Sequence, residues 1–212
     1  MGPCRVTPKA PRGICGCDVH GIVARNYLRF TAGGAATHSD HGRSICHTLY
    51  LAKEGGNYTV KDPEKLKRIA GEWGIETEGR DIYDLAHEVA ETALMEYGKP
   101  FGYTRFIQRA PEHTQKLWHD AGIEPRAIDR EVSQSLHMTH MGCSSLPEAL
   151  IRQSLRAGLC DGWGGSMCGT EFSDVLFGTP KPIDTTANLG VMEKDMVNIV
   201  VHGHDPSLSE MI

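Results

Sequence analysis

Over most of the chain, the apolar positions recur at the three-to-four-residue spacing of α-helices. Between Asp81 and Tyr97 they fall on one side of a helix, and the pattern ends before Gly98. Proline marks several helix starts, because the first amides of a helix have no acceptor within it. The pattern predicts helices over 18–32, 36–53, 62–73, 81–97, 111–121, 125–141 and 146–158. We therefore expect a mainly α fold, with a helical domain over 18–180.

The pattern changes after Pro180. Residues 196–201 form a short β-branched apolar run, typical of a strand that is buried on both faces, and a glycine turn over 202–204 follows. We interpret residues 181–212 as the first strand and turn of a truncated α/β (Rossmann-like) domain. A parallel strand needs a partner, which the few remaining residues cannot supply, so the chain is expected to be incomplete.

Composition and charge exclude several classes of function. A formal net charge of −5 gives no electrostatic reason to expect nucleic acid or a membrane surface as partner. The chain has no apolar run of about 18 residues that could span a membrane, and its first residues lack the apolar core of a signal peptide. A cytoplasmic location is expected. In that reducing compartment, seven cysteines favour metal ligation or redox chemistry over disulfides.

Three of the cysteines, Cys4, Cys15 and Cys17, lie in a loop rich in proline, glycine and arginine. Small residues let backbone N–H groups approach the sulfurs, and nearby arginines offset the charge of a cluster. On spacing alone an iron–sulfur cluster, a zinc site and incidental thiols all stay open. An iron–sulfur cluster normally takes four protein ligands, so residues 1–17 are interpreted as a partial cluster loop. The other cysteines are expected to be buried structural thiols: Cys46, Cys143, Cys160 and Cys168.

Histidines at 38, 41 and 47, with Ser44 at the missing step, follow one predicted helix at intervals of three residues. The four positions span about 13 Å of helix. Imidazoles titrate near neutral pH, so such a series can pass protons along. A polar helix face with solvated histidines is the alternative.

Two further positions attract attention. His204 lies in the turn after the predicted strand, where it can ligate a metal or bond to backbone. Asp161 lies in the sequence Cys-Asp-Gly-Trp-Gly-Gly over 160–165, interpreted as a glycine-rich turn that packs closely near a site.

In their order along the chain, several segments resemble the catalytic subunit of the anaerobic nickel–iron–sulfur carbon-monoxide dehydrogenases. The matching segments are Gly2-Pro3-Cys4-Arg5, Gly13-Ile14-Cys15-Gly16, 22–26, 32–43, 141–143, 174–180, 188–191 and 201–204. The resemblance implies oxidation of CO with water to CO2, two electrons and two protons at a nickel–iron–sulfur cluster. It also implies a homodimer with [4Fe–4S] clusters and a ferredoxin-like electron acceptor. It does not separate monofunctional members from those associated with an acetyl-CoA synthase subunit.

The resemblance also implies ligands. Cys4 and Cys15 match the last two cysteines of the [4Fe–4S] motif, and His204 matches the histidine ligand of the nickel–iron–sulfur cluster. Cys17 stands where alanine is usual and is an uncertain ligand. The remaining cysteine ligands of both clusters are absent from these 212 residues, which alone are expected to be inactive.

Roles in proton transfer follow from the same resemblance. His38 matches a histidine that acts as acid and base beside the substrate, and Asp161 matches a further acid/base aspartate. His41 and His47 match steps of a proton path, and Ser44 stands where some members carry another histidine.

Two other functions stay open at this point. One is the related hybrid-cluster (hydroxylamine reductase) branch, against which the Gly-Pro-Cys-Arg and His-Ser-Asp-His stretches count. The other is a short helical module without catalytic activity that binds zinc or one cluster for electron transfer.

Overall fold

The computed structural model describes residues 6–54, 58–181 and 194–199, and this part of the chain is helical. Its elements are α1 (Val19–Leu51), η1 (Ala52–Glu54), α2 (Pro63–Glu72), α3 (Ile82–Gly98), η2 (Arg105–Arg109), α4 (Glu112–Asp120), α5 (Ile128–Thr139), α6 (Pro147–Cys160), η3 (Asp161–Ser166) and α7 (Met167–Phe177). The segment η3 is a π-helix, and η1 and η2 are 3-10 helices. The mainly α fold is therefore confirmed.

The expected start of an α/β domain is not seen. Residues 196–199 belong to the predicted strand, but among the described residues they form none. A strand is defined by its pairing with a neighbour, and the described part of the chain offers these residues no strand to pair with. The rest of that segment lies outside the described residues, so the division of the chain into domains stays a prediction.

The longest element is α1, a single helix of 33 residues and about 50 Å. Its N-cap residue is Asp18, whose carboxylate accepts a hydrogen bond from the Gly21 N–H at 2.9 Å. The prediction of two helices, 18–32 and 36–53, was wrong, because the helix continues through Gly33 and Gly34. Contacts with α3, α5, α6 and α7 along its length outweigh the weak helix propensity of the two glycines.

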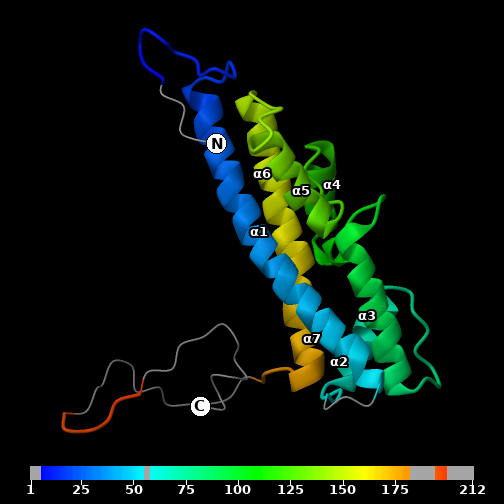
Figure 1. Ribbon diagram of the computed structural model, residues 1–212. Coiled ribbons are helices and arrows are strands. Elements are labelled where there is room, and N and C mark those ends of the chain that lie inside the picture. Colours follow the sequence, from blue (N-terminus) through cyan, green and yellow to red (C-terminus); the bar gives the residue numbers. More distant parts are fainter. Residues whose placement is uncertain (1–5, 55–57, 182–193, 200–212) are drawn as a thin grey trace.

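A second long helix runs beside α1 and in the same direction (Figure 1). It consists of α6, η3 and α7, which follow one another without a break from Pro147 to Phe177. The predicted helix over 146–158 is thus confirmed but continues further, and the glycine-rich turn expected over 160–165 is a π-helix instead. Its glycines do not break the helix; two of them, Gly164 and Gly165, are buried in contacts with neighbouring elements.

The main hydrophobic core lies where the C-terminal half of α1 meets α2, α3 and α7. Leu49, Val89 and Phe172 are fully buried there. Trp73 lies edge-on to Phe172, with 6.0 Å between ring centroids. Toward the N-terminal end of α1, a smaller cluster of Ala24, Leu28 and Leu150 joins this helix to α6.

A buried ion pair joins α5 to the loop before it, and Gln153 of α6 bonds to the same carboxylate. Glu131 is fully buried, and its Oε2 accepts hydrogen bonds from Arg126 at 2.7 Å and Gln153 at 3.0 Å. Burial by itself would raise the pKa of the Glu131 carboxyl, but the hydrogen bonds from Arg126 and Gln153 outweigh it and hold the pKa below its usual value.

None of the helices in the described ranges combines the length and apolar character needed to cross a membrane.

Candidate functional site

His38 and Asp161 come from the two long parallel helices and meet side by side. The distance from His38 Nδ1 to Asp161 Oδ1 is 2.7 Å. An ionised carboxylate can only accept a hydrogen bond, so it places the imidazole proton on Nδ1. The His38 side chain is 52% exposed. Its Nε2 is thus left as the nitrogen that can exchange a proton with a bound molecule.

Ser166 supports the same carboxylate from the other end of η3. Its Oγ donates to Asp161 Oδ1 at 3.1 Å. Residues five apart lie about 140° apart around an α-helix. Hydrogen bonds of a π-helix join residues i and i+5, which brings such residues to nearly the same face. The π-helix therefore lets Ser166 reach the oxygen that His38 also contacts.

Glycines bring η3 into direct contact with α1 at this level. A Cβ on Gly165 would lie 2.8 Å from the backbone nitrogen of Ser39 and 2.9 Å from the backbone carbon of His38. A Cβ on Gly42 would lie 2.4 Å from the Gly165 carbonyl oxygen. Both distances are too short for a side chain, so backbone contact between the helices fixes Asp161 opposite His38.

The other members of the predicted proton path follow on α1. His41, Ser44 and His47 are exposed, and each step of three residues rises about 4.5 Å along the helix. A Cβ on Gly169 of α7 would lie 3.2 Å from His41 Nδ1, so the His41 ring packs on that glycine. Among these described side chains, no direct hydrogen bond joins one step to the next.

Cys15 lies 23 residues before His38, in the loop before α1. It is exposed, and its Sγ accepts a hydrogen bond from Arg25 Nη1 at 3.4 Å. Hydrogen bonds from the Cys17 backbone N–H and from Arg25 hold the pKa of the Cys15 thiol below its usual value. The thiolate form, which is the form that ligates metals, is thereby favoured.

Cys17 has a different environment from Cys15. It is fully buried, and a Cβ on Gly21 would lie 2.3 Å from its Sγ. The thiol therefore packs against the first turn of α1. The two remaining predicted ligands, Cys4 and His204, lie outside the described residues.

The described residues do not form a complete metal site. In the ranges that the structure describes, no three or more His, Cys, Asp or Glu side chains gather closely enough to hold a metal ion. Cys15 fits a single ligand of an iron–sulfur cluster, because it is exposed and its sulfur accepts N–H hydrogen bonds.

The remaining cysteines follow the sequence prediction in three cases of four. Cys46, Cys160 and Cys168 are buried in the main core. Burial is the main reason that the pKa of the Cys160 thiol is raised. Cys143 is exposed instead, because it lies in the loop between α5 and α6, where its Sγ lies 3.3 Å from the His137 carbonyl oxygen.

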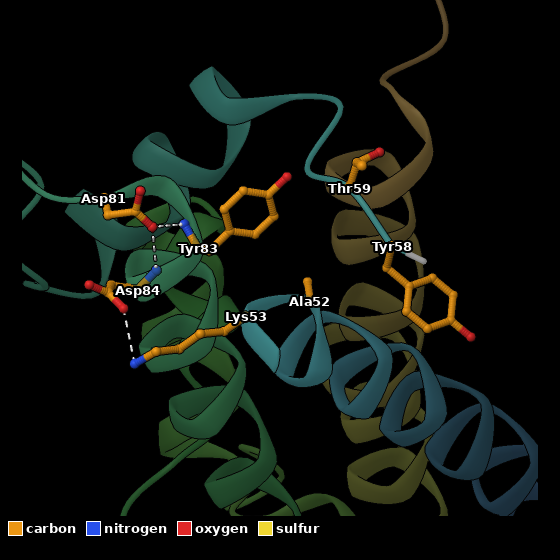
Figure 2. A pocket seen from close by; sticks show the side chains of 7 residues that line it. All are labelled: Ala52, Lys53, Tyr58, Thr59, Asp81, Tyr83 and Asp84. Carbon is orange, nitrogen blue, oxygen red and sulfur yellow. Dashed lines mark hydrogen bonds and ion pairs between the residues drawn. The ribbon is translucent and has the colours of Figure 1, made fainter. Parts of the chain in front are cut away.

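A pocket lies elsewhere, beside the C-terminal end of α1 (Figure 2). It is lined by Ala52, Lys53, Tyr58, Thr59, Asp81, Tyr83 and Asp84. Lys53 pairs with Asp84 at 2.9 Å, and Asp81 accepts hydrogen bonds from the first amides of α3. Its charged side chains thus have structural roles, and none of the predicted site residues lines it.

Two residues of the site were not found from the sequence. Arg25 is a buried charge on the apolar side of α1, next to Ala24, and a charged residue at a helix position expected to be buried could have indicated it. Nothing in the sequence indicated a role for Ser166, because its contact with Asp161 depends on a π-helix that the apolar pattern does not predict.

Known proteins of one family match the chain along its whole length. The profile of the Prismane/CO dehydrogenase family matches residues 1–212. The chain is 48% identical over 217 residues to carbon monoxide dehydrogenase 1 of Methanosarcina mazei, of which it covers 35%. It is 43% identical over 221 residues to carbon monoxide dehydrogenase 1 of Carboxydothermus hydrogenoformans, of which it covers 34%.

Solved structures are similar as well. A nickel-free carbon monoxide dehydrogenase from Thermococcus sp. AM4 superimposes with a TM-score of 0.83 at 46% identity, over 92% of this chain and 32% of that one. An acetyl-CoA synthase/carbon monoxide dehydrogenase described with nickel-containing [Fe4S4] clusters gives a TM-score of 0.81 at 36% identity, over 86% of this chain and 28% of that one. The chain therefore belongs to the Prismane/CO dehydrogenase family, and it spans about a third of the length of the relatives that it matches.

Proposed function

We propose that the protein containing this chain is an anaerobic carbon-monoxide dehydrogenase that oxidises CO with water to CO2, two electrons and two protons. The observation that carries the proposal is the 2.7 Å contact between His38 and Asp161 on facing helices. It supplies an oriented acid/base group, which this reaction needs because water must lose protons as electrons leave. The named relatives are carbon monoxide dehydrogenases, which favours this reaction over that of the hybrid-cluster branch.

The clusters would be held by residues at both ends of the chain. Cys15, together with Cys4, would ligate a [4Fe–4S] cluster, and His204 would ligate the nickel–iron–sulfur cluster. Bound in this way, the clusters supply the site of CO oxidation and a path for electrons to a ferredoxin-like acceptor. The burial of Cys17 against Gly21 supports a packing role for that thiol rather than ligation.

The His38 imidazole would act as base and then as acid at Nε2. Asp161 accepts the Nδ1 hydrogen bond, so it keeps the neutral ring in the tautomer with a free Nε2 and stabilises the ring when Nε2 takes a proton. The proton would then pass along α1 by way of His41, Ser44 and His47. Steps of about 4.5 Å along the helix are longer than a hydrogen bond, so water molecules would bridge them.

We further propose that the whole protein is a homodimer, either monofunctional or associated with an acetyl-CoA synthase subunit. The relatives include proteins named as a carbon monoxide dehydrogenase and one named as an acetyl-CoA synthase/carbon monoxide dehydrogenase, so both forms are kept in the proposal.

The test is the substitution His38→Gln in the full-length, metal-loaded protein. Loss of a positioned acid/base group lowers rates by about 10²- to 10⁴-fold, so we expect kcat for CO oxidation with an artificial electron acceptor to fall in that range. His113→Gln, at an exposed histidine of α4, is the matched control and should leave kcat unchanged. Wild-type protein with complete clusters and no CO oxidation would refute the proposed function. Unchanged kcat in His38→Gln would refute the role of His38.

A further inference from the structure

Arg25 is a buried cation without a carboxylate partner in the described part of the chain. Its residue is 6% exposed, on the second turn of α1. The guanidinium makes its hydrogen bonds in two directions: Nε and Nη2 donate to the Ser144 and Gly142 carbonyl oxygens at 2.7 and 3.1 Å, and Nη1 donates to Cys15 Sγ at 3.4 Å. Among the described residues, no Asp or Glu forms an ion pair with it.

The buried guanidinium of Arg25 needs a negatively charged partner. Burial of a charge is costly unless the charge is paired, and carbonyl oxygens supply only partial negative charge. Of the groups that Arg25 contacts in the described ranges, Cys15 is the one that can carry a full negative charge, as a thiolate or as a cluster ligand. The backbone N–H of Cys17 donates to the same sulfur.

We propose that Arg25 positions Cys15 and compensates the charge of the iron–sulfur cluster that Cys15 ligates, and that it thereby raises the reduction potential of that cluster. The inference rests on the proposed function only in taking Cys15 as a cluster ligand. A [4Fe–4S] cluster becomes more negative by one charge when it accepts an electron. A buried cation and an N–H···S hydrogen bond therefore stabilise the reduced form more than the oxidised form.

Arg25 also ties the cluster loop to the helical domain. One edge of its planar guanidinium is occupied by the 142–144 loop between α5 and α6, and the opposite nitrogen reaches the sulfur. A lysine carries the charge at one point and cannot serve both sides at once. Arg25→Lys is therefore expected to keep part of the effect, and Arg25→Gln to lose most of it.

The experiment is a redox titration of the full-length protein, reconstituted anaerobically with iron and sulfide and followed by electron paramagnetic resonance. The signal that disappears in Cys15→Ala identifies the cluster concerned. Arg25→Gln is expected to shift the midpoint potential of that signal to more negative values, and Arg25→Lys to shift it less. Arg29→Gln is the matched control: Arg29 lies one turn further along α1, but donates to Asn26 Oδ1 at 2.6 Å and the Thr139 carbonyl oxygen at 3.0 Å. It should leave the potential unchanged.

An unshifted potential in Arg25→Gln, with the iron content of wild type, would overturn the inference, as would an equal shift in Arg29→Gln. If Arg25→Gln fails to retain the cluster, Arg25→Lys decides: a potential equal to that of wild type would likewise overturn it. If Cys15→Ala loses none of the signals, Cys15 is not a ligand, and the inference is overturned together with that assignment. Because the potential is read without CO, these outcomes remain distinguishable from a failure of the protein to oxidise CO.

Discussion

At the scale of single residues, Asp161 is notable because one of its oxygens serves two donors. Oδ1 accepts from His38 Nδ1 at 2.7 Å and from Ser166 Oγ at 3.1 Å. Two donors from different directions leave the carboxylate less freedom to rotate. A carboxylate held in this way keeps the imidazole in the orientation that acid/base transfer needs.

Ser166→Ala should therefore lower kcat for CO oxidation about fivefold in the full-length enzyme, the equivalent of one hydrogen bond of about 1 kcal/mol. KM should change little, because the hydroxyl contacts Asp161 and not the substrate. Ser166→Thr keeps the hydroxyl and should restore the rate. Thr170→Val removes a hydroxyl from the next turn, which donates to the Ser166 carbonyl oxygen, and serves as control. The measurement is steady-state kinetics of wild type and the three variants. A Ser166→Thr enzyme as slow as Ser166→Ala would contradict the prediction.

The sequence predicts the site residues unevenly at this scale. A three-residue spacing suffices to put His38, His41 and His47 on one helix, because helical geometry is local. The pairing of His38 with Asp161 joins residues 123 positions apart in the sequence. A local sequence pattern cannot predict a contact between residues so widely separated. The glycine-rich sequence over 160–165 indicated close packing near Asp161, and the family resemblance suggested its acid/base role. Nothing in the sequence pointed to its support by Ser166.

At the scale of elements, two differences from prediction concern helices that continue through glycines, and a third is the predicted strand, which residues 196–199 do not form. Gly33 and Gly34 lie within α1, and the 160–165 segment lies within the second long helix. Glycine disfavours a helix by about 1 kcal/mol per residue. Packing along a 33-residue helix contributes more than that, so tertiary contacts decide. Local propensity cannot report those contacts, which is why the predicted boundaries failed at these places.

The close contact of η3 with α1 leads to a prediction about Gly165. A Cβ there would lie 2.8 Å from the backbone nitrogen of Ser39, so Gly165→Ala must push the two helices apart. Overpacking of this kind costs about 1–3 kcal/mol, and displacement of Asp161 should also lower the rate of CO oxidation. Gly162→Ala is the control, because its Cβ would meet no atom within 4 Å. Amide hydrogen exchange over 161–177 should be faster in the first variant and unchanged or slower in the second. Equal exchange in both would contradict the close approach.

At the scale of the whole molecule, the helical class followed from the sequence, but the arrangement of helices did not. The parallel course of α1 and the helix from Pro147 to Phe177 arises from contacts between distant segments (Figure 1). Buried polar groups contribute to that arrangement, and apolar periodicity does not indicate them. Glu131 is an example: a single-sequence pattern places a glutamate on a solvated face, but here Arg126 and Gln153 pair with it in the interior.

Glu131 makes the stability of this helical assembly depend on pH. Its pKa in the folded state lies below the usual glutamate value of about 4.3. The carboxylate therefore contributes its full stabilisation above that value, and loses it as pH falls through the lowered pKa. Glu131→Gln breaks the pair and leaves the Arg126 charge in place, at a cost of about 3 kcal/mol near neutral pH.

The free energy of opening, measured by hydrogen exchange over 128–139, should then differ most between wild type and the Glu131→Gln variant above about pH 5. The difference should shrink below about pH 4, because wild type loses there what the variant already lacks. Glu91→Gln, at an exposed position of α3, should show no such difference at any pH. A gap between wild type and Glu131→Gln that stays constant down to acidic pH would mean that the shape of the Glu131 side chain, rather than its charge, stabilises the contact between α5 and α6.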